Sequence, residues 1–274
     1  MKPFSIGVFD SGLGGLSVLK DILDELPQYN YIYFGDNARV PYSGKSAELI
    51  YEYTRKAVDF LMKKNCLLVI LACNTATAIS LPKIQREYLI HCYPERRVLG
   101  IIRPTVEAIV EKNSKRVGIM ATYATVISKS FVAELKKLDD KIDVYQNACP
   151  LLVPVIEEGE VQWEGLNLLL RKYLAPLKEK NIDTLVLGCT HYGLIDKKIR
   201  SLVGPSTKIL SEGKVTAQKL KEYLKRHSAL EKKLAKGKKR EYYVSDLNER
   251  YKKMIRFFLG KRFSKNDKIS QVKE

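Results

Sequence analysis

A regular alternation of short, β-branched apolar runs and longer amphipathic stretches leaves this 274-residue chain few possible folds. Between the runs, apolar residues recur at helical spacing, as from Leu16 to Leu26 and from Ile50 to Leu61. Strands that alternate with helices are typical of α/β layering around a parallel sheet. The nine expected strands are Ser5–Phe9, Tyr31–Phe34, Leu67–Leu71, Arg97–Ile101, Arg116–Met120, Lys141–Tyr145, Thr184–Leu187, Lys208–Leu210 and Glu241–Val244. Further helices are expected from Pro104 to about Asn113, over Trp163–Lys180 and over Lys214–His227.

Two pairs of segments resemble each other. Leu68–Thr75 and Thr184–His191 each run from an apolar strand through a small residue to a cysteine, which hydrogen-bonding side chains follow. Likewise, Ser5–Asp10 resembles Arg116–Ala121. The members of each pair are separated by similar distances along the chain, which indicates two related α/β halves.

We therefore expect an α/β fold of two similar domains with mainly parallel sheets, related by pseudo-symmetry. The first domain should comprise residues 1–98 and 206–274, and the second residues 99–205. Because ligands of parallel sheets bind beyond the carboxyl ends of the strands, the active site should lie in the cleft between the domains.

The composition is that of an ordinary globular protein, with 45% hydrophobic residues. Apolar stretches such as Cys66–Cys73 are far shorter than the roughly 20 residues of a membrane span. The N-terminal residues lack the layout of a signal peptide. The sequence thus predicts a cytoplasmic protein that does not interact with membranes.

The net charge of +17 is unevenly placed, because residues 206–274 contain 21 basic and 8 acidic residues. A basic tail can bind nucleic acid. No RNP, helix-turn-helix or zinc-finger pattern accompanies the charge, so a solvated, lysine-rich helix face is the favoured interpretation.

The five cysteines include no CxxC pair, and the three histidines lack metal-ligand spacing, which argues against a zinc site or a disulfide scaffold. Cys66, Cys92 and Cys149 are interpreted as small hydrophobic residues. Cys73 and Cys189 instead follow strands, where a helix N-terminus lowers the pKa of a thiol and binds a carboxylate. These two are therefore candidate reactive thiols.

Polar neighbours set these two cysteines apart. Asn74, Thr75, Thr190 and His191 are side chains that an apolar core would not hold without a ligand. Asp10 opens a glycine-rich loop that matches no nucleotide-binding motif. It could pair with a thiol or an ammonium group, or merely cap the following helix.

Four motifs, in this order and at this spacing, resemble the signatures of the glutamate racemases in the aspartate/glutamate racemase family. They are FDSGLGG at 9–15, YFGDNARVPY at 33–42, ACNTATA at 72–78 and GCTHY at 188–192. The resemblance covers nearly the whole chain, and the two cysteine motifs carry most of its specificity.

The resemblance implies a racemase that needs no pyridoxal phosphate, metal or other cofactor. Cys73 and Cys189 would exchange the α-proton of glutamate from opposite faces. It further implies that Asp10 assists Cys73, that His191 assists Cys189, and that Glu157 is a carboxylate near the second thiol. The product would be D-glutamate for bacterial peptidoglycan synthesis, made by a homodimer.

The same resemblance implies a set of substrate contacts in which hydroxyl and amide donors, rather than an arginine, bind the side-chain carboxylate. These residues are Asp10, Ser11, Pro41, Tyr42, Ser43, Asn74, Thr75, Thr122, Thr125, Thr190 and His191.

Four positions depart from the family pattern without removing a proposed catalytic group. Ser43 stands where glycine usually follows Pro-Tyr, and Asn37 stands where threonine is usual. Gly193 replaces a proline, and 211–213 departs from an Asp-Ser-containing pattern.

Three alternatives remain. The chain could be a racemase of aspartate or of a hydantoin, or a nucleic-acid-binding protein that uses its basic C-terminal quarter. It could also be a thiol redox protein in which Cys73 and Cys189 form a disulfide.

Overall fold

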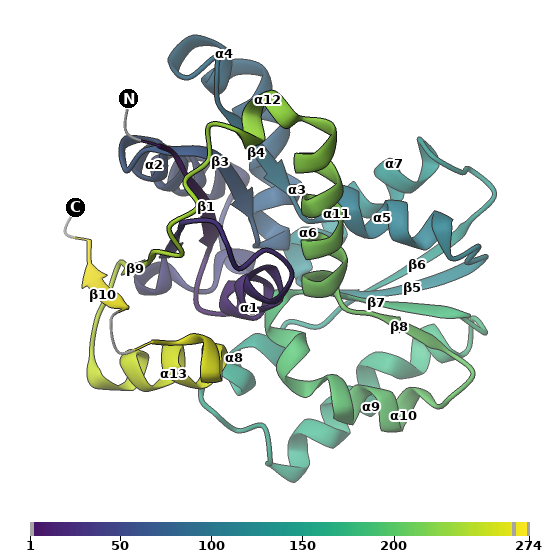
Figure 1. Ribbon diagram of the computed structural model, residues 1–274. Coiled ribbons are helices and arrows are strands. Elements are labelled where there is room, and N and C mark those ends of the chain that lie inside the picture. Colours follow the sequence, from purple (N-terminus) through teal and green to yellow (C-terminus); the bar gives the residue numbers. More distant parts are fainter. Residues whose placement is uncertain (1–2, 265–266, 273–274) are drawn as a thin grey trace.

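The computed structural model describes residues 3–264 and 267–272, and it contains two parallel sheets flanked by helices (Figure 1). The larger sheet has the order β10-β9-β2-β1-β3-β4, and the smaller sheet has the order β6-β5-β7-β8. The strands are β1 (Ser5–Asp10), β2 (Tyr31–Gly35), β3 (Cys66–Leu71), β4 (Arg97–Gly100), β5 (Arg116–Ala121), β6 (Asp143–Ala148), β7 (Thr184–Gly188), β8 (Lys208–Leu210), β9 (Arg240–Val244) and β10 (Lys268–Gln271).

One order of four strands occurs twice. The order β2-β1-β3-β4 in the larger sheet has the same connectivity as β6-β5-β7-β8 in the smaller one, and all these neighbours pair in parallel. In this repeat β3 is equivalent to β7. The predicted α/β fold with two similar, mainly parallel sheets is confirmed.

Helices cover both faces of the larger sheet. Within β1, Ile6 and Val8 pack into one apolar cluster with α1 and α11, while Phe9 faces the opposite cluster with α2. The α-helices are α1 (Gly15–Glu25), α2 (Ala47–Lys63), α3 (Asn74–Lys83), α4 (Leu89–Cys92), α5 (Ile102–Glu111), α6 (Tyr123–Ile127), α7 (Ser130–Lys136), α8 (Leu152–Glu157), α9 (Glu164–Lys178), α10 (Asp196–Val203), α11 (Glu212–Arg226), α12 (Ser228–Glu231) and α13 (Glu249–Leu259). Short helical turns are η1 (Asn37–Arg39), η2 (Tyr42–Gly44), η3 (Ile84–Tyr88), η4 (Thr190–Ile195) and η5 (Gly260–Arg262).

All nine predicted strands are present, with one clear shift and one omission. Strand β6 begins and ends later than the predicted Lys141–Tyr145. Strand β10 was not predicted, because its four residues, KISQ, offer a single apolar side chain. It joins the sheet only at the edge, beside β9.

The chain passes between the sheets twice, through α5 and through α11 (Figure 1). The boundary expected near residue 206 falls too early for the second sheet, because β8 pairs with β7 and extends that sheet to Leu210. The first sheet likewise runs to Gly100 rather than ending at residue 98. The division into two domains itself stays a prediction.

About half of the basic C-terminal segment is helical, and two lysines of α11 pair with nearby acids. In α11, Lys221 Nζ lies 2.6 Å from Glu25 Oε1, and Lys219 is paired with Glu111. Exposed pairs of this kind fit the solvated-face interpretation, and nucleic-acid binding stays untested. Among the described residues, no helix combines the length and apolar character that crossing a bilayer requires.

Candidate active site

The two candidate thiols follow equivalent strands of the two sheets. Cys73 lies just beyond β3 and caps α3, with its Sγ accepting a hydrogen bond from the backbone N–H of Ala76 at 3.4 Å. Cys189 lies just beyond β7 and precedes η4. Both are therefore at carboxyl ends of parallel strands, where the loops of such sheets bind ligands.

Both cysteines line one small cavity, of about 20 Å³, which is room for about one water molecule. Eleven of the fourteen predicted site residues line it: Ser11, Pro41, Tyr42, Ser43, Cys73, Asn74, Thr75, Thr122, Cys189, Thr190 and His191. The other three each contact a lining residue. Asp10 hydrogen-bonds to Thr190, Thr125 to Thr122, and Glu157 to His191. The structure thus gathers all fourteen at the junction of the sheets.

Cys73 is a buried thiol. Its Sγ lies 3.2 Å from Ser11 Oγ. Burial raises the pKa of Cys73 to about 12, and the negative charge of Asp10 adds to the rise, while hydrogen bonds from Ser11 and Ala76 oppose it. The N–H of Ala76 at the helix N-terminus lowers the pKa of Cys73, as predicted, but removal of the thiolate from water outweighs it, so the predicted net lowering is not found.

Asp10, at the end of β1, is fully buried. Its Oδ2 accepts a hydrogen bond from Gly12 N at 2.9 Å, and its Oδ1 accepts one from Thr190 Oγ1 at 3.3 Å. Burial raises the pKa of Asp10, while the positive charge of His191 is the main opposing influence. Asp10 therefore influences the Cys73 thiol through its charge, whereas Ser11 and the Ala76 N–H are in hydrogen-bond contact with it.

Cys189 lies beside a histidine–carboxylate pair. Its Sγ is 3.8 Å from His191 Nδ1, and His191 Nε2 is 2.9 Å from Glu157 Oε1. Burial lowers the pKa of His191, but its hydrogen bonds to Cys189 and Glu157 outweigh burial and raise the pKa well above its usual range. Arg250 of α13 donates to the Glu157 carbonyl at 2.6 Å and so holds this end of α8. The result is an imidazolium in contact with the second thiol.

Close approach of the two sheets depends on a glycine. A Cβ on Gly14, in the loop after β1, would lie 2.5 Å from Thr190 Oγ1 and 2.6 Å from His191 Nδ1. Contacts that short do not occur without a shift of the neighbours. The glycine-rich loop therefore lets the first half of the chain reach the loop after Cys189.

Three threonine hydroxyls meet on one side of the cavity. Thr75 Oγ1 lies 2.9 Å from Thr122 Oγ1 and 3.4 Å from Thr125 Oγ1, and the last two are 3.0 Å apart. Thr75 comes from the start of α3, and the other two come from the start of α6. Buried hydroxyls of this kind can turn their hydrogens toward a carboxylate.

The sequence matches the model of the Asp/Glu/hydantoin racemase family over residues 6–220. The chain belongs to this family. The predicted resemblance is confirmed, and with it the prediction that the chain is an enzyme of the racemase class.

Similar proteins cover the chain almost completely. It is 38% identical to the glutamate racemase of Chlorobaculum parvum, over 93% of this chain and 92% of that protein. A glutamate racemase isoform of Bacillus anthracis has a TM-score of 0.89 at 30% identity, covering 100% of this chain and 98% of its own. The glutamate racemase of Francisella tularensis, solved in complex with D-glutamate, has a TM-score of 0.87 at 31% identity, with the same coverage.

Departures from the family pattern are accommodated locally. Asn37 is buried and exchanges two hydrogen bonds with the backbone of Asp246, at 2.8 and 3.3 Å. Ser43 lines the cavity beside Tyr42. A Cβ on Gly193 would meet only ordinary contacts, so glycine is not required there by space.

Tyr42 is already engaged within the protein. Its hydroxyl donates to Asp36 Oδ2 at 2.5 Å, and this carboxylate is also paired with Arg39 at 2.7 Å. The predicted contact of Tyr42 with a substrate would therefore use its backbone or the acceptor side of its hydroxyl.

One buried acid near the cavity was not predicted. Glu212 hydrogen-bonds to Asn74, a cavity residue. The only signal in the sequence was the unusual segment at 211–213. Nothing in that pattern indicates that Asn74, which is 138 positions away, would be the partner.

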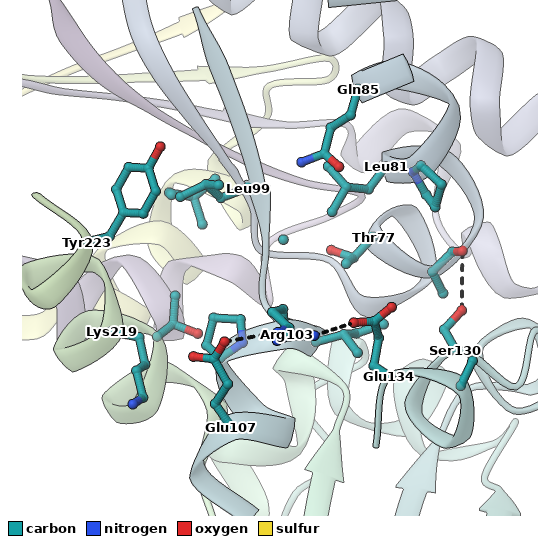
Figure 2. A pocket seen from close by; sticks show the side chains of 18 of the residues that line it. Thr77, Leu81, Gln85, Leu99, Arg103, Glu107, Ser130, Glu134, Lys219 and Tyr223 are labelled. Carbon is teal, nitrogen blue, oxygen red and sulfur yellow. Dashed lines mark hydrogen bonds and ion pairs between the residues drawn. The ribbon is translucent and has the colours of Figure 1, made fainter. Parts of the chain in front are cut away.

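A larger cavity, of about 600 Å³, lies elsewhere, between α3 and the two connections α5 and α11 (Figure 2). Arg103 in this cavity is paired with Glu107 at 2.9 Å and with Glu134 at 3.1 Å. None of the fourteen predicted site residues, all of which the structure describes, lines it. Size alone therefore does not identify the site.

In the described part of the chain, no group of three or more His, Cys, Asp or Glu side chains could hold a metal ion. All five cysteines are free thiols. The expectation that the enzyme needs no cofactor stays a prediction.

Proposed function

We propose that this protein interconverts L- and D-glutamate without a cofactor, with Cys73 and Cys189 as the groups that transfer the proton. One observation carries the proposal: the two cysteines follow equivalent strands of different sheets, and both line one cavity. Racemisation needs a base on one face of the α-carbon and an acid on the other, and two such thiols meet that requirement.

The chemistry balances without any further reactant. One cysteine, as the thiolate, takes the α-proton, so an S–H bond forms as the C–H bond breaks and the electron pair stays on the α-carbon. The other cysteine, as the thiol, gives its proton to the opposite face. The two cysteines end with exchanged protonation states, and the reverse reaction restores them.

Electrostatics must supply much of the stabilisation, because an α-proton of an amino acid is very weakly acidic. His191 lies between Cys189 and Glu157 and is proposed to assist proton transfer at Cys189. Asp10 and Ser11 are proposed to act on Cys73.

Glutamate is the proposed substrate for two reasons. The relatives with the similarity described above are named glutamate racemases, and one was solved in complex with D-glutamate. In addition, the Thr75–Thr122–Thr125 hydroxyl cluster offers neutral donors for a carboxylate.

We also propose that the D-glutamate supplies peptidoglycan synthesis in a bacterial cytoplasm and that the enzyme is a homodimer. Family resemblance supports these points. A requirement for external D-glutamate after depletion of the protein would test the first, and sedimentation would test the second.

Circular dichroism of the purified protein with L-glutamate, D-glutamate and L-aspartate tests the main proposal. Glutamate of either hand should lose its signal, and dialysis against a chelator or removal of pyridoxal phosphate should change nothing. Turnover of aspartate but not glutamate would overturn the substrate, and no racemisation would overturn the function.

A further inference from the structure

A buried carboxyl group lies directly behind one of the cavity residues. Glu212, the first residue of α11, is 3% exposed. Its Oε2 accepts a hydrogen bond from Asn74 Nδ2 at 2.5 Å, and its Oε1 lies 3.5 Å from Thr105 Oγ1. Asn74 is therefore the close partner of Glu212, and Thr105, whose hydroxyl donates to Ile101 O at 2.8 Å, is a longer second contact.

Glu212 occupies a junction of three segments. Asn74 begins α3, immediately after Cys73. Thr105 lies in α5 and Glu212 in α11, which are the two connections between the sheets. The carboxyl group thus links both connections to the residue next to a candidate thiol.

The amide of Asn74 has one end bound and one end free. Its nitrogen donates to Glu212, while its Oδ1 is buried and receives no hydrogen bond from any described residue. Asn74 also lines the cavity. At neutral pH the ammonium group is the only hydrogen-bond donor of glutamate, so a buried, unpaired acceptor matches that group.

We propose that Glu212 is a positioning residue that holds the Asn74 amide with its nitrogen toward Glu212 and its oxygen available to the substrate ammonium. This inference rests on the proposed function. Without Glu212, rotation about the last side-chain bond would exchange oxygen and nitrogen, and a donor would then face the ammonium.

The hydrogen bond survives at neutral pH in either protonation state. Burial raises the pKa of Glu212 to about 8, while its bonds to Asn74 and Thr105 oppose the rise. The protonated acid and the carboxylate each keep an oxygen that can accept from Asn74 Nδ2.

A double-mutant cycle tests the inference. Glu212→Ala should lower kcat/KM for glutamate by about 10- to 100-fold, mostly through KM, because a substrate-binding contact is lost. Glu212→Gln, which keeps an acceptor, should stay within about threefold of wild type. In an Asn74→Ala background, Glu212→Ala should cost less than about twofold more, since both changes remove one interaction.

Glu222→Ala is the matched control, because Glu222 lies on the same helix at the surface and pairs with Lys219. Its kcat/KM should equal that of wild type. Equal losses from Glu212→Ala in the presence and absence of Asn74 would overturn the inference, since Glu212 would then act by another route. Thermal unfolding would show whether each variant folds.

Crystal structures separate this inference from the proposed function. In Glu212→Ala, the Asn74 side chain should rotate or become disordered. An unchanged Asn74 orientation would overturn the positioning role even if the protein racemises glutamate. Conversely, a rotated Asn74 in a protein that does not racemise glutamate would support the positioning of the amide and overturn only the proposed function.

Discussion

The surroundings of Cys73 and Cys189 differ although the strands that carry them are equivalent. Both residues are buried to the same degree, at 6% and 7% exposure, so burial does not distinguish them. Cys73 contacts the neutral hydroxyl of Ser11, and the negative charge of Asp10 contributes to its raised pKa. Cys189 contacts His191, whose pKa is raised by its partners. The repeated topology sets where the thiols lie, and side-chain contacts set their charge.

The enzyme is therefore asymmetric at rest. With a pKa of about 12, Cys73 holds its proton at neutral pH, and its protonated form is suited to donate. On the other side, Cys189 is in contact with the His191–Glu157 pair. We expect Cys73 to be a proton donor in the resting enzyme.

The largest effects should follow removal of either thiol. Cys73→Ser and Cys189→Ser should each lower racemisation by at least 10²–10⁴-fold, the range of general acid–base catalysis. With a chlorinated glutamate analogue, each variant should still eliminate chloride from the one enantiomer that its remaining thiol deprotonates. Circular dichroism and chloride release measure the two reactions.

Cys92→Ser is the control, because Cys92 is exposed and does not line the cavity. It should keep wild-type activity. Identical residual elimination of both enantiomers by both serine variants would contradict the assignment of one thiol to each face.

Loss of a side chain that assists one thiol should slow only the reaction of the enantiomer that this thiol deprotonates. His191→Asn should slow elimination from the enantiomer that Cys189 deprotonates by about 10- to 100-fold and change the other less than about threefold. Chloride release from each enantiomer measures this, because the equilibrium constant of a racemase ties its two kcat/KM values together. His227→Asn, at an exposed position, serves as the control, and equal effects on both enantiomers would contradict the comparison.

A smaller effect concerns stability on the Cys73 side. Burial raises the pKa of Glu212 from its usual 4.5 to about 8 in the folded protein. The folded state therefore binds the proton more tightly, and the stability from Glu212 is present below pH 4.5 and lost as pH rises through 8. Relative to Glu212→Gln, wild type should lose roughly 3.5 kcal/mol of unfolding free energy between pH 5 and pH 8. Urea unfolding at the two pH values measures this, and a constant difference would contradict it.

The smallest effect is on the reactivity of Cys73. Alkylation of Cys73 at neutral pH should be slow, because the thiolate fraction is small. Asp10→Asn removes a charge that raises the pKa of Cys73, so the alkylation rate should increase about fivefold. Mass spectrometry resolves the modified cysteine, with Cys92 as an internal reference. A rate equal to wild type would show that Asp10 does not influence this thiol.

Much of the fold followed from periodicity. Nine strands and the two related halves were predicted because apolar runs, turns and helical spacing are local properties of the chain. Strand β10 and the membership of β8 in the second sheet were not, because short edge strands are defined by pairing partners distant in sequence.

The candidate site was predicted as a set of motifs, and the structure brings all of them to one cavity. Two features of the site could not be predicted from the sequence. The high pKa of Cys73 depends on how completely the fold removes it from water. The contact of Glu212 with Asn74 depends on how the connection through α11 returns to the first sheet. Neither the burial of a residue nor a contact between distant segments can be predicted from the local spacing of residues along the chain.

The small size of the cavity has a consequence for turnover. Glutamate is several times larger than the single water that about 20 Å³ admits, so it cannot enter while the sheets lie this close. We therefore expect each catalytic cycle to include an opening before glutamate binds and another before it is released. Since α5 and α11 are the covalent links between the sheets, they are where such a motion would pivot, and gating there, rather than proton transfer, can set the maximal rate.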